Sequence, residues 1–149
     1  MFTTLCAIVA QTVQCSADII FVLDASNSVG SSANFNKVKS FVSQLVGRLD
    51  IDSGNTRVGV LTYADGIEDR IDLNDHTSVS SLQTAVSGLS YSGDSETNTH
   101  KALARVRKKM LTAGSGDRVN VDNVVILITA GPSEDEDKTK VSIIELERL

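Results

Sequence analysis

Residues 18–30 read Asp-Ile-Ile-Phe-Val-Leu-Asp-Ala-Ser-Asn-Ser-Val-Gly, and this stretch decides the fold. Its apolar part, residues 19–23, is mostly β-branched or aromatic, which is typical of a strand buried on both faces. A second run of this kind, Val-Val-Ile-Leu-Ile, occupies residues 124–128. Strands buried on both faces occur in parallel sheets that helices cover on each side. The two runs therefore predict a layered α/β domain.

Two weaker strands and four helices are expected around these runs. Residues 57–63 form an apolar strand, whereas residues 67–73 alternate apolar and charged side chains, which predicts a strand at a sheet edge. Apolar residues at helical spacing predict helices within residues 35–49, 79–89, 102–110 and 133–146. The last helix is expected to open at Ser133, because Ser133 and Glu136 have the spacing of a capping box. This order of elements predicts a largely parallel sheet.

Composition excludes several classes of protein. The chain has 149 residues and a net charge of -5, which indicates one domain and speaks against a general nucleic-acid binder. No apolar run reaches the ~18 residues of a membrane-spanning helix. Cys6 and Cys15 are too few for a disulfide scaffold or a zinc site. The chain has neither a phosphate-binding Gly-x-x-x-x-Gly-Lys-Ser/Thr loop nor a nucleophile elbow, so we expect no enzyme.

The first sixteen residues have two interpretations. Residues 5–10 are a short apolar stretch that suits the core of a signal peptide, but no Lys or Arg precedes them. Residues 1–16 are therefore either a signal peptide or a linker, and residues 17–149 form the domain.

Oxygen-bearing side chains follow the first strand. In parallel α/β sheets ligands bind beyond the carboxyl ends of the strands, where Asp24, Ser26 and Ser28 lie. Carboxylate and hydroxyl oxygens are ligands for Mg²⁺ or Ca²⁺. The same pattern is also typical of a turn whose side chains bond the local backbone, so the residues alone leave both interpretations open.

Three segments together resemble the von Willebrand factor type A domain family. Residues 18–30 resemble its opening strand and Asp-x-Ser-x-Ser motif, and residues 96–103 resemble its Thr-x-Thr-Gly-x-Ala-Leu segment. Residues 124–131, with Ser133 and Asp135, resemble its apolar strand, Thr-Asp-Gly motif and acidic helix start. The resemblance runs from about Ala17 to near the C-terminus. It implies a three-layer, doubly wound, Rossmann-like fold, whose mostly parallel sheet has one antiparallel edge strand.

The resemblance also implies that the domain is truncated. Family members have roughly six strands, whereas this sequence predicts four. We therefore expect residues 17–149 to be an incomplete domain that lacks its last strands. The run at 124–128 then becomes a sheet edge, which is an aggregation hazard or a place for a partner strand.

The family has a metal-ion-dependent adhesion site that holds Mg²⁺. By resemblance, Asp24, Ser26 and Ser28 match its first motif, and Thr97 matches its threonine. The family's remaining ligand, the Asp of Thr-Asp-Gly, is replaced here by Ala130. One unit charge at 4 Å is worth ~4 kcal/mol at an effective dielectric constant near 20, before desolvation. The site is therefore predicted to be degraded, with weak or absent Mg²⁺ binding.

Four further residues are predicted to line the ligand-binding rim of this site: Asn27, Asp94, Glu96 and His100. The two acids precede Thr97 and could lend a carboxylate to the ion, directly or through water; the alternative is that they solvate the loop. The histidine stands where the family tends to have a small residue. It is interpreted either as a rim residue or as a neutral surface histidine.

The function implied by the resemblance is extracellular protein–protein adhesion. In the complete family site an acidic side chain of the protein ligand fills the open coordination position, and collagen or another matrix protein is such a ligand. The chain is then expected to be secreted. The alternatives are a structural matrix domain that binds without metal and an intracellular type A module of a larger assembly.

Basic residues crowd the third expected helix: Lys101, Arg105, Arg107, Lys108 and Lys109. They form either a basic patch for sulfated glycans or acidic proteins, or a solvated helix face.

Overall fold

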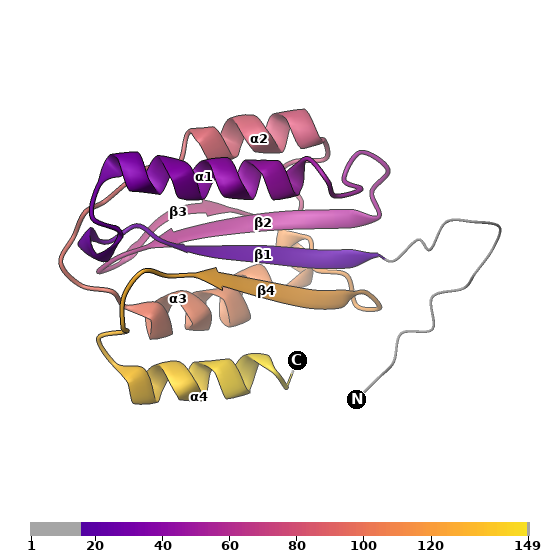
Figure 1. Ribbon diagram of the computed structural model, residues 1–149. Helices are drawn as coiled ribbons and strands as arrows, with labels where there is room; N and C mark the ends of the chain where they lie inside the picture. Colours follow the sequence, from indigo (N-terminus) through magenta and orange to yellow (C-terminus); the bar gives the residue numbers. More distant parts are fainter. Residues whose placement is uncertain (1–15, 149) are drawn as a thin grey trace.

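The computed structural model describes residues 16–148, which form a four-stranded sheet with helices on both faces (Figure 1). The strands are β1 (Ala17–Asp24), β2 (Thr56–Tyr63), β3 (Ile67–Ile71) and β4 (Asp122–Ile128), in the spatial order β3-β2-β1-β4. Strand β1 runs parallel to both β2 and β4, whereas β3 is antiparallel to β2. The predicted mostly parallel sheet with one antiparallel edge strand is confirmed. Cys6, Cys15 and all but the last residue of the predicted signal peptide or linker (1–16) lie outside the described residues.

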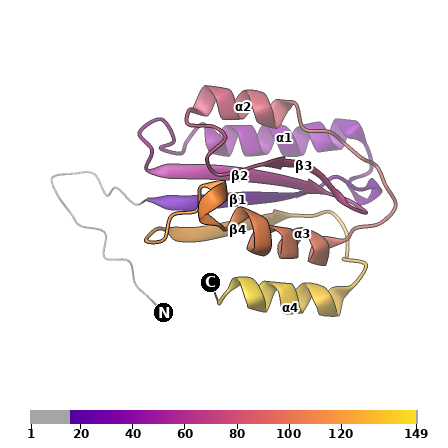
Figure 2. The same ribbon diagram turned by 180° about the vertical axis from the view of Figure 1, so that it is seen from behind.

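The helices form the two outer layers. Helices α1 (Ser32–Val46) and α2 (Val79–Ser87) lie on one face of the sheet, and α3 (Thr99–Arg105) and α4 (Glu136–Leu146) lie on the other (Figures 1 and 2). A π-helical turn (Val106–Met110) continues α3, and 3-10 turns span Asn27–Val29 and Ala113–Ser115. Within residues 16–148, no helix has both the length and the apolar character that crossing a membrane requires.

Strand β1 is buried on both faces, as its apolar run predicts. Phe21 and Leu23 belong to the core under α1 and α2, while Ile20 and Val22 belong to the core under α3. Each of these four side chains is at most 1% exposed. The run in β4 behaves differently, because β4 is an edge of the described sheet. Val124 in β4 is 41% exposed, so the expectation of burial on both faces is wrong there.

Two helix boundaries differ from the sequence prediction. Helix α4 begins at Glu136 and not at Ser133, because the Asp135 carboxylate accepts the N–H of Lys138 at 2.9 Å and caps the helix. The Ser133 hydroxyl instead accepts from the Thr139 hydroxyl at 2.8 Å. The third expected helix is α-helical only as far as Arg105 and then widens into the π-turn.

A buried ion pair holds the amino end of the sheet together. Asp18 in β1 is fully buried, and its carboxylate accepts two hydrogen bonds from the Arg118 guanidinium, at 2.6 and 2.9 Å. Arg118 also donates to the carbonyl oxygens of Ala17, Gly54 and Asn55. This end is opposite to the one where the oxygen-bearing side chains collect.

Candidate functional site

The candidate site lies at the carboxyl ends of β1 and β4. Asp24 is the last residue of β1, and Ser26 follows it in extended conformation and caps the 3-10 turn at Asn27–Val29. This turn folds the chain back, so that Ser26 and Ser28 both lie over the Asp24 carboxylate. Thr97 arrives from the loop before α3, and Ala130 follows β4.

Four side chains meet there. The two carboxylate oxygens of Asp24 accept from the hydroxyls of Ser26 (2.7 Å) and Ser28 (2.8 Å). The Ser26 hydroxyl oxygen also lies 2.8 Å from that of Ser28 and 2.9 Å from that of Thr97. We call Asp24, Ser26, Ser28 and Thr97 the oxygen cluster. The structure therefore brings together the four residues that the sequence predicts as metal ligands.

Asp24 is 1% exposed, yet its charged form is favoured. Burial by itself raises the pKa of this carboxyl group. Hydrogen bonds from the Ser26 hydroxyl and N–H, the Ser28 hydroxyl and the Ala130 N–H outweigh burial, and the pKa lies below its ordinary value. The cluster therefore carries one negative charge near neutral pH.

The loop after β4 reaches Asp24 in a way that the sequence analysis missed. The Thr129 hydroxyl donates to Asp24 Oδ2 at 3.0 Å, and the Ala130 N–H donates to the same oxygen at 3.2 Å. Gly131 packs against Ser28, because a Cβ atom added at this glycine would lie 2.9 Å from Ser28 Cβ. The signal for Thr129 was its place at the end of a strand parallel to β1.

Tyr63, at the end of β2, lies beneath this region and was also missed. It is fully buried, and its hydroxyl lies 3.0 Å from that of Thr99. Burial raises the pKa of Tyr63, and the charge of Asp24 adds to this effect, although hydrogen bonds with Thr99 and Thr129 oppose it. Tyr63 is therefore a neutral hydrogen-bonding support for the loops around the cluster.

The cluster has more short oxygen contacts than hydroxyl protons. Four contacts of 2.7–2.9 Å join its oxygens, and three hydroxyls supply one proton each. The ionised Asp24 supplies none. However the protons are arranged, one pair of oxygens meets with lone pairs facing each other. A cation among these oxygens removes that repulsion, and hard oxygen donors are the ligands that Mg²⁺ prefers.

The charge of the cluster fits a dication less well. The cluster contains one carboxylate, and Ala130 presents a methyl group where the family has another. Among the described residues, no group of three or more His, Cys, Asp or Glu side chains is placed to hold a metal ion. The chemistry of the donors fits a divalent cation, whereas the single carboxylate supplies one negative charge against its two positive charges.

The predicted rim acids point to partners outside the cluster. The Asp94 carboxylate accepts from the Ser92 hydroxyl at 2.5 Å, and the Glu96 carboxylate accepts from the Asn98 side-chain amide at 2.9 Å. Asn27 is exposed, and its backbone N–H donates to the Asp94 carbonyl oxygen at 2.8 Å. Within residues 16–148, no hydrogen bond joins either carboxylate group to the side chains of the oxygen cluster.

His100 faces the contact between α3 and α4. Its carbonyl oxygen lies 3.5 Å from the Ser142 hydroxyl in α4. Its Nδ1 atom is buried and has no hydrogen-bond partner among the described residues. The structure therefore does not bring His100 into the oxygen cluster.

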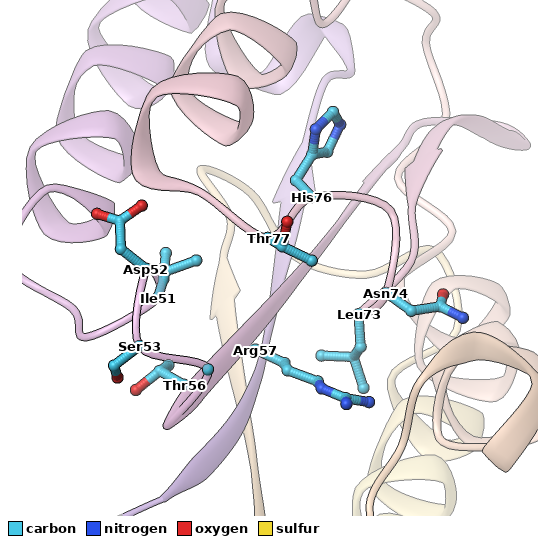
Figure 3. A pocket seen from close by; sticks show the side chains of 10 residues that line it. Ile51, Asp52, Ser53, Thr56, Arg57, Leu73, Asn74, His76 and Thr77 are labelled. Atoms are coloured by element: carbon cyan, nitrogen blue, oxygen red, sulfur yellow. The ribbon is translucent and has the colours of Figure 1, made fainter.

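A separate concave region lies near the amino end of β2 (Figure 3). It has a volume of about 340 Å³, and its walls come from the loop before β2, the start of β2 and the loop before α2. Its main polar groups have structural partners: Arg57 donates to the Gly116 carbonyl at 2.7 Å, and Asp52 accepts from the Val79 N–H at 3.1 Å. This region contains no residue of the oxygen cluster.

Known proteins resemble the chain in sequence. Von Willebrand factor of Rattus norvegicus is 33% identical over 119 residues, covering 80% of this chain and 27% of that protein. The collagen alpha-4(VI) chain of Mus musculus is 38% identical over 122 residues, covering 80% of this chain and 5% of that protein. The chain thus spans about a quarter or less of the length of these relatives. They are adhesion and matrix proteins, which supports a protein-binding module.

Solved structures share the fold. Proximal thread matrix protein 1 from the mussel byssus superimposes with a TM-score of 0.84 at 22% identity, covering 90% of this chain and 35% of that one. Another structure of the same protein, with a TM-score of 0.78 and 22% identity, has a zinc-occupied MIDAS motif, the abbreviation for a metal-ion-dependent adhesion site. In addition, residues 18–147 match the family model described as "von Willebrand factor type A domain". The chain belongs to the von Willebrand factor type A domain family.

Proposed function

We propose that this chain is an extracellular adhesion module that binds a protein ligand through a divalent cation held weakly at the oxygen cluster. One observation carries the proposal: four contacts among the cluster oxygens compete for three hydroxyl protons. In any arrangement of these protons, at least one short oxygen–oxygen contact has no proton between its two atoms, and a bound cation would relieve that repulsion.

Asp24, Ser26, Ser28 and Thr97 would hold the ion, which would supply a positive charge for an acidic side chain of the ligand. The cluster is open to such a side chain, because Ser28, Thr129 and Ala130 are exposed. Asp24 and Ser26 are buried and fix the position of the donors. Mg²⁺ is the expected ion because all four donors are hard oxygens.

Weak binding follows from Ala130. Asp24 is the one carboxylate among the four donors, so a dication keeps more of its charge than it would beside a second carboxylate. That excess charge attracts an acidic ligand more strongly, while the protein holds the ion less strongly. The relatives that are matrix proteins support collagen or another matrix protein as the ligand and secretion as the location.

A metal-independent structural domain is the second candidate, and the neighbours of Asp24 favour it. Its carboxylate accepts from the Ser26 N–H, from three hydroxyls and from the Ala130 N–H. These donors stabilise the carboxylate charge without an ion.

Calorimetric titration with MgCl2 tests the proposal on the chain and on Ala130→Asp, with Ala130→Asn as a control that changes size without charge. We expect measurable but weak Mg²⁺ binding to the chain and to Ala130→Asn, and tighter binding to Ala130→Asp. In chelator, Ala130→Asp should unfold at a lower temperature because two carboxylates then face each other, and Mg²⁺ should restore it by mass action.

The results separate the two candidates. If neither the chain nor Ala130→Asp binds Mg²⁺, the cluster is structural and the metal-independent candidate stands. Equal affinity of the two proteins would contradict the account of the missing carboxylate. Adhesion itself is measured by binding to immobilised collagen, which should require Mg²⁺ and decrease in chelator.

A further inference from the structure

Helix α3 and the π-helical turn that follows it present a row of cations on an acidic protein. Lys101, Arg105, Lys108 and Lys109 are all exposed, and all line one groove of about 650 Å³ between α3 and the β2–β3 turn. We call these four residues the α3 basic row. Helix α3 lies on the sheet face opposite to α1 and α2 (Figure 2). The chain as a whole has a net charge of -5, so the row is a local reversal of sign.

Most of the charge in this row is not neutralised by the protein. Lys101 pairs with Asp65 at 3.6 Å, and both side chains are at least half exposed. Arg105, Lys108 and Lys109 form no ion pair with any residue between 16 and 148. By contrast Arg107, on the neighbouring face of the turn, pairs with Glu145 of α4 at 2.8 Å and does not line the groove.

Repulsion within the α3 basic row is expected to lower the stability of the unbound protein. Lys101 and Arg105 are four positions apart on α3, and Arg105 and Lys109 are again four apart. Like charges at this spacing repel each other on a helix. The helix dipole favours cations in the last turn but not Lys101, which lies in the first turn of α3. A bound polyanion would remove this repulsion.

The shape of the row selects an extended ligand. Its residues extend over eight positions from Lys101 to Lys109, about 12 Å along a helix, whereas the donors for a single phosphate surround one point. The π-turn keeps the row continuous, because its i→i+5 bond from the Leu111 N–H to the Val106 carbonyl (3.0 Å) leaves Lys108 and Lys109 on the groove side. The Ser115 hydroxyl donates to the Lys109 carbonyl at 2.7 Å and fixes this turn.

We propose that the α3 basic row binds a linear sulfated polysaccharide. A single-stranded nucleic acid is disfavoured because the groove has no aromatic side chain on which bases could stack. A membrane surface is disfavoured because none of the exposed large apolar side chains lines the groove. A sulfated chain needs neither feature, since its charge density supplies the attraction and releases bound counterions.

Titration with a heparin-derived oligosaccharide at about 0.15 M ionic strength tests the proposal. The titration is done in chelator, so its outcome does not depend on cation binding at the oxygen cluster. The test variant is Arg105→Gln/Lys108→Gln/Lys109→Gln. The matched control, Lys37→Gln/Arg48→Gln/Lys140→Gln, removes the same charge from exposed positions on α1, the loop after it and α4. Thermal unfolding is measured on both variants to check that they fold.

We expect the test variant to lose about tenfold or more in affinity, with a salt dependence that is shallower by about three counterions. The control should lose less affinity, with a change in the logarithm of Kd that is less than a third of the change in the test variant. Equal losses in the two variants would overturn the proposal, because they would show a response to net charge alone. Equal binding of the desulfated oligosaccharide would overturn it as well. So would tighter binding to a charge-matched single-stranded oligonucleotide or to anionic phospholipid vesicles.

A second measurement needs no variant. Acetylation of lysines in the unmodified chain, followed by mass spectrometry, reports which amines the oligosaccharide covers. Lys101, Lys108 and Lys109 should be protected and Lys37 should not. Uniform protection of all four would contradict the proposed location.

Discussion

The hydroxyl oxygens of Ser26 and Thr97 lie 2.9 Å apart, although 71 positions separate the two residues in the sequence. This contact joins the turn after β1 to the loop before α3. It is also one of the four short oxygen–oxygen contacts of the cluster, which outnumber the three hydroxyl protons available to them. We therefore expect the contact to contribute differently to the stability of the protein when a cation is bound and when none is bound.

Replacing Thr97 by valine should separate a role of its hydroxyl in the stability of the fold from a role in binding a cation. Thr97→Val keeps the volume of a buried side chain that is 4% exposed and removes one hydroxyl from the cluster. We expect the unfolding temperature in chelator to stay within about 2–4 °C, which is the shift from ~1 kcal/mol in a protein of this size. Mg²⁺ affinity should fall about tenfold or more, because one of four donors is lost.

Thr99→Val is the control for this substitution. It makes the same change two residues further on, at a side chain that is 3% exposed and whose hydroxyl is paired with Tyr63. The lost hydrogen bond should lower stability by about 1–3 kcal/mol, with Mg²⁺ affinity unchanged. If Thr97→Val destabilises the chain as much as Thr99→Val does, the Ser26–Thr97 contact is an ordinary hydrogen bond, and the proton count does not describe the cluster.

Gly131→Ala should disturb the cluster from the side of β4. Its new Cβ atom would lie 2.9 Å from Ser28 Cβ, so Ser28 or the loop must move. We expect a loss of about 1–3 kcal/mol in unfolding free energy and weaker Mg²⁺ binding. Gly114→Ala is the control, because no atom lies within 4 Å of its added Cβ, and denaturant titration should show a change of less than about 0.5 kcal/mol. A variant Gly131→Ala with unchanged Mg²⁺ affinity would show that Ser28 is not needed in its present position.

Local sequence patterns predict much of this fold. The run at residues 19–23 identifies the central strand, because burial on both faces leaves no polar position in it. The alternation at residues 67–71 identifies the edge strand β3, whose residues alternate between partly buried and exposed until the buried Ile71. Both patterns reflect burial, which can be predicted residue by residue because buried positions carry apolar side chains and exposed positions carry polar ones.

Features that depend on contacts between distant segments are harder to predict. Asp135 rather than Ser133 caps α4, and Ser133 is bonded to Thr139 instead. In the candidate site, the order of the motifs places Asp24 and Thr97 together, but the bonds from Thr129 and Ala130 to Asp24 come from the register of β4 against β1. The roles of the cluster residues as metal ligands stay predictions.

The amino end of α4 should loosen in acid. The Asp135 carboxylate accepts from the Lys138 ammonium and N–H, and these bonds hold its pKa below the ordinary value of 3.8. Because the pKa is lower in the folded state, the ionised carboxylate stabilises the fold fully at pH values above about 3.8. This contribution is lost as the pH falls through the lower pKa of the folded state. Chemical shifts of the Cα atoms at residues 136–139 should report fraying of this helix turn in that range.

Asp135→Asn is the matched variant for this effect. Asparagine caps helices about as well as aspartate but does not titrate. The fraying of α4 with falling pH should therefore be absent in Asp135→Asn, while the helix stays formed at neutral pH. If both proteins fray in parallel, another acid controls this helix end.

The outer edge of β4 should make the chain self-associate. Strand β4 pairs with β1 on one side, and the described residues place no strand on its other side. Val124 in β4 is 41% exposed, and residues 124–128 carry no charge. An uncharged open edge pairs readily with another strand, and an outward lysine prevents such pairing. Val124→Lys should therefore reduce the concentration-dependent association seen by sedimentation velocity.

The control for this edge is another exposed apolar residue that lies outside the sheet. Phe41 on α1 is 52% exposed, so Phe41→Lys adds the same charge and removes apolar surface without touching a strand. If Phe41→Lys lowers association as much as Val124→Lys does, the contact is a general apolar one and the β4 edge is not its cause. Val124→Lys should cost at most ~1 kcal/mol of stability, the span of strand propensities, so a difference in association is not explained by unfolding.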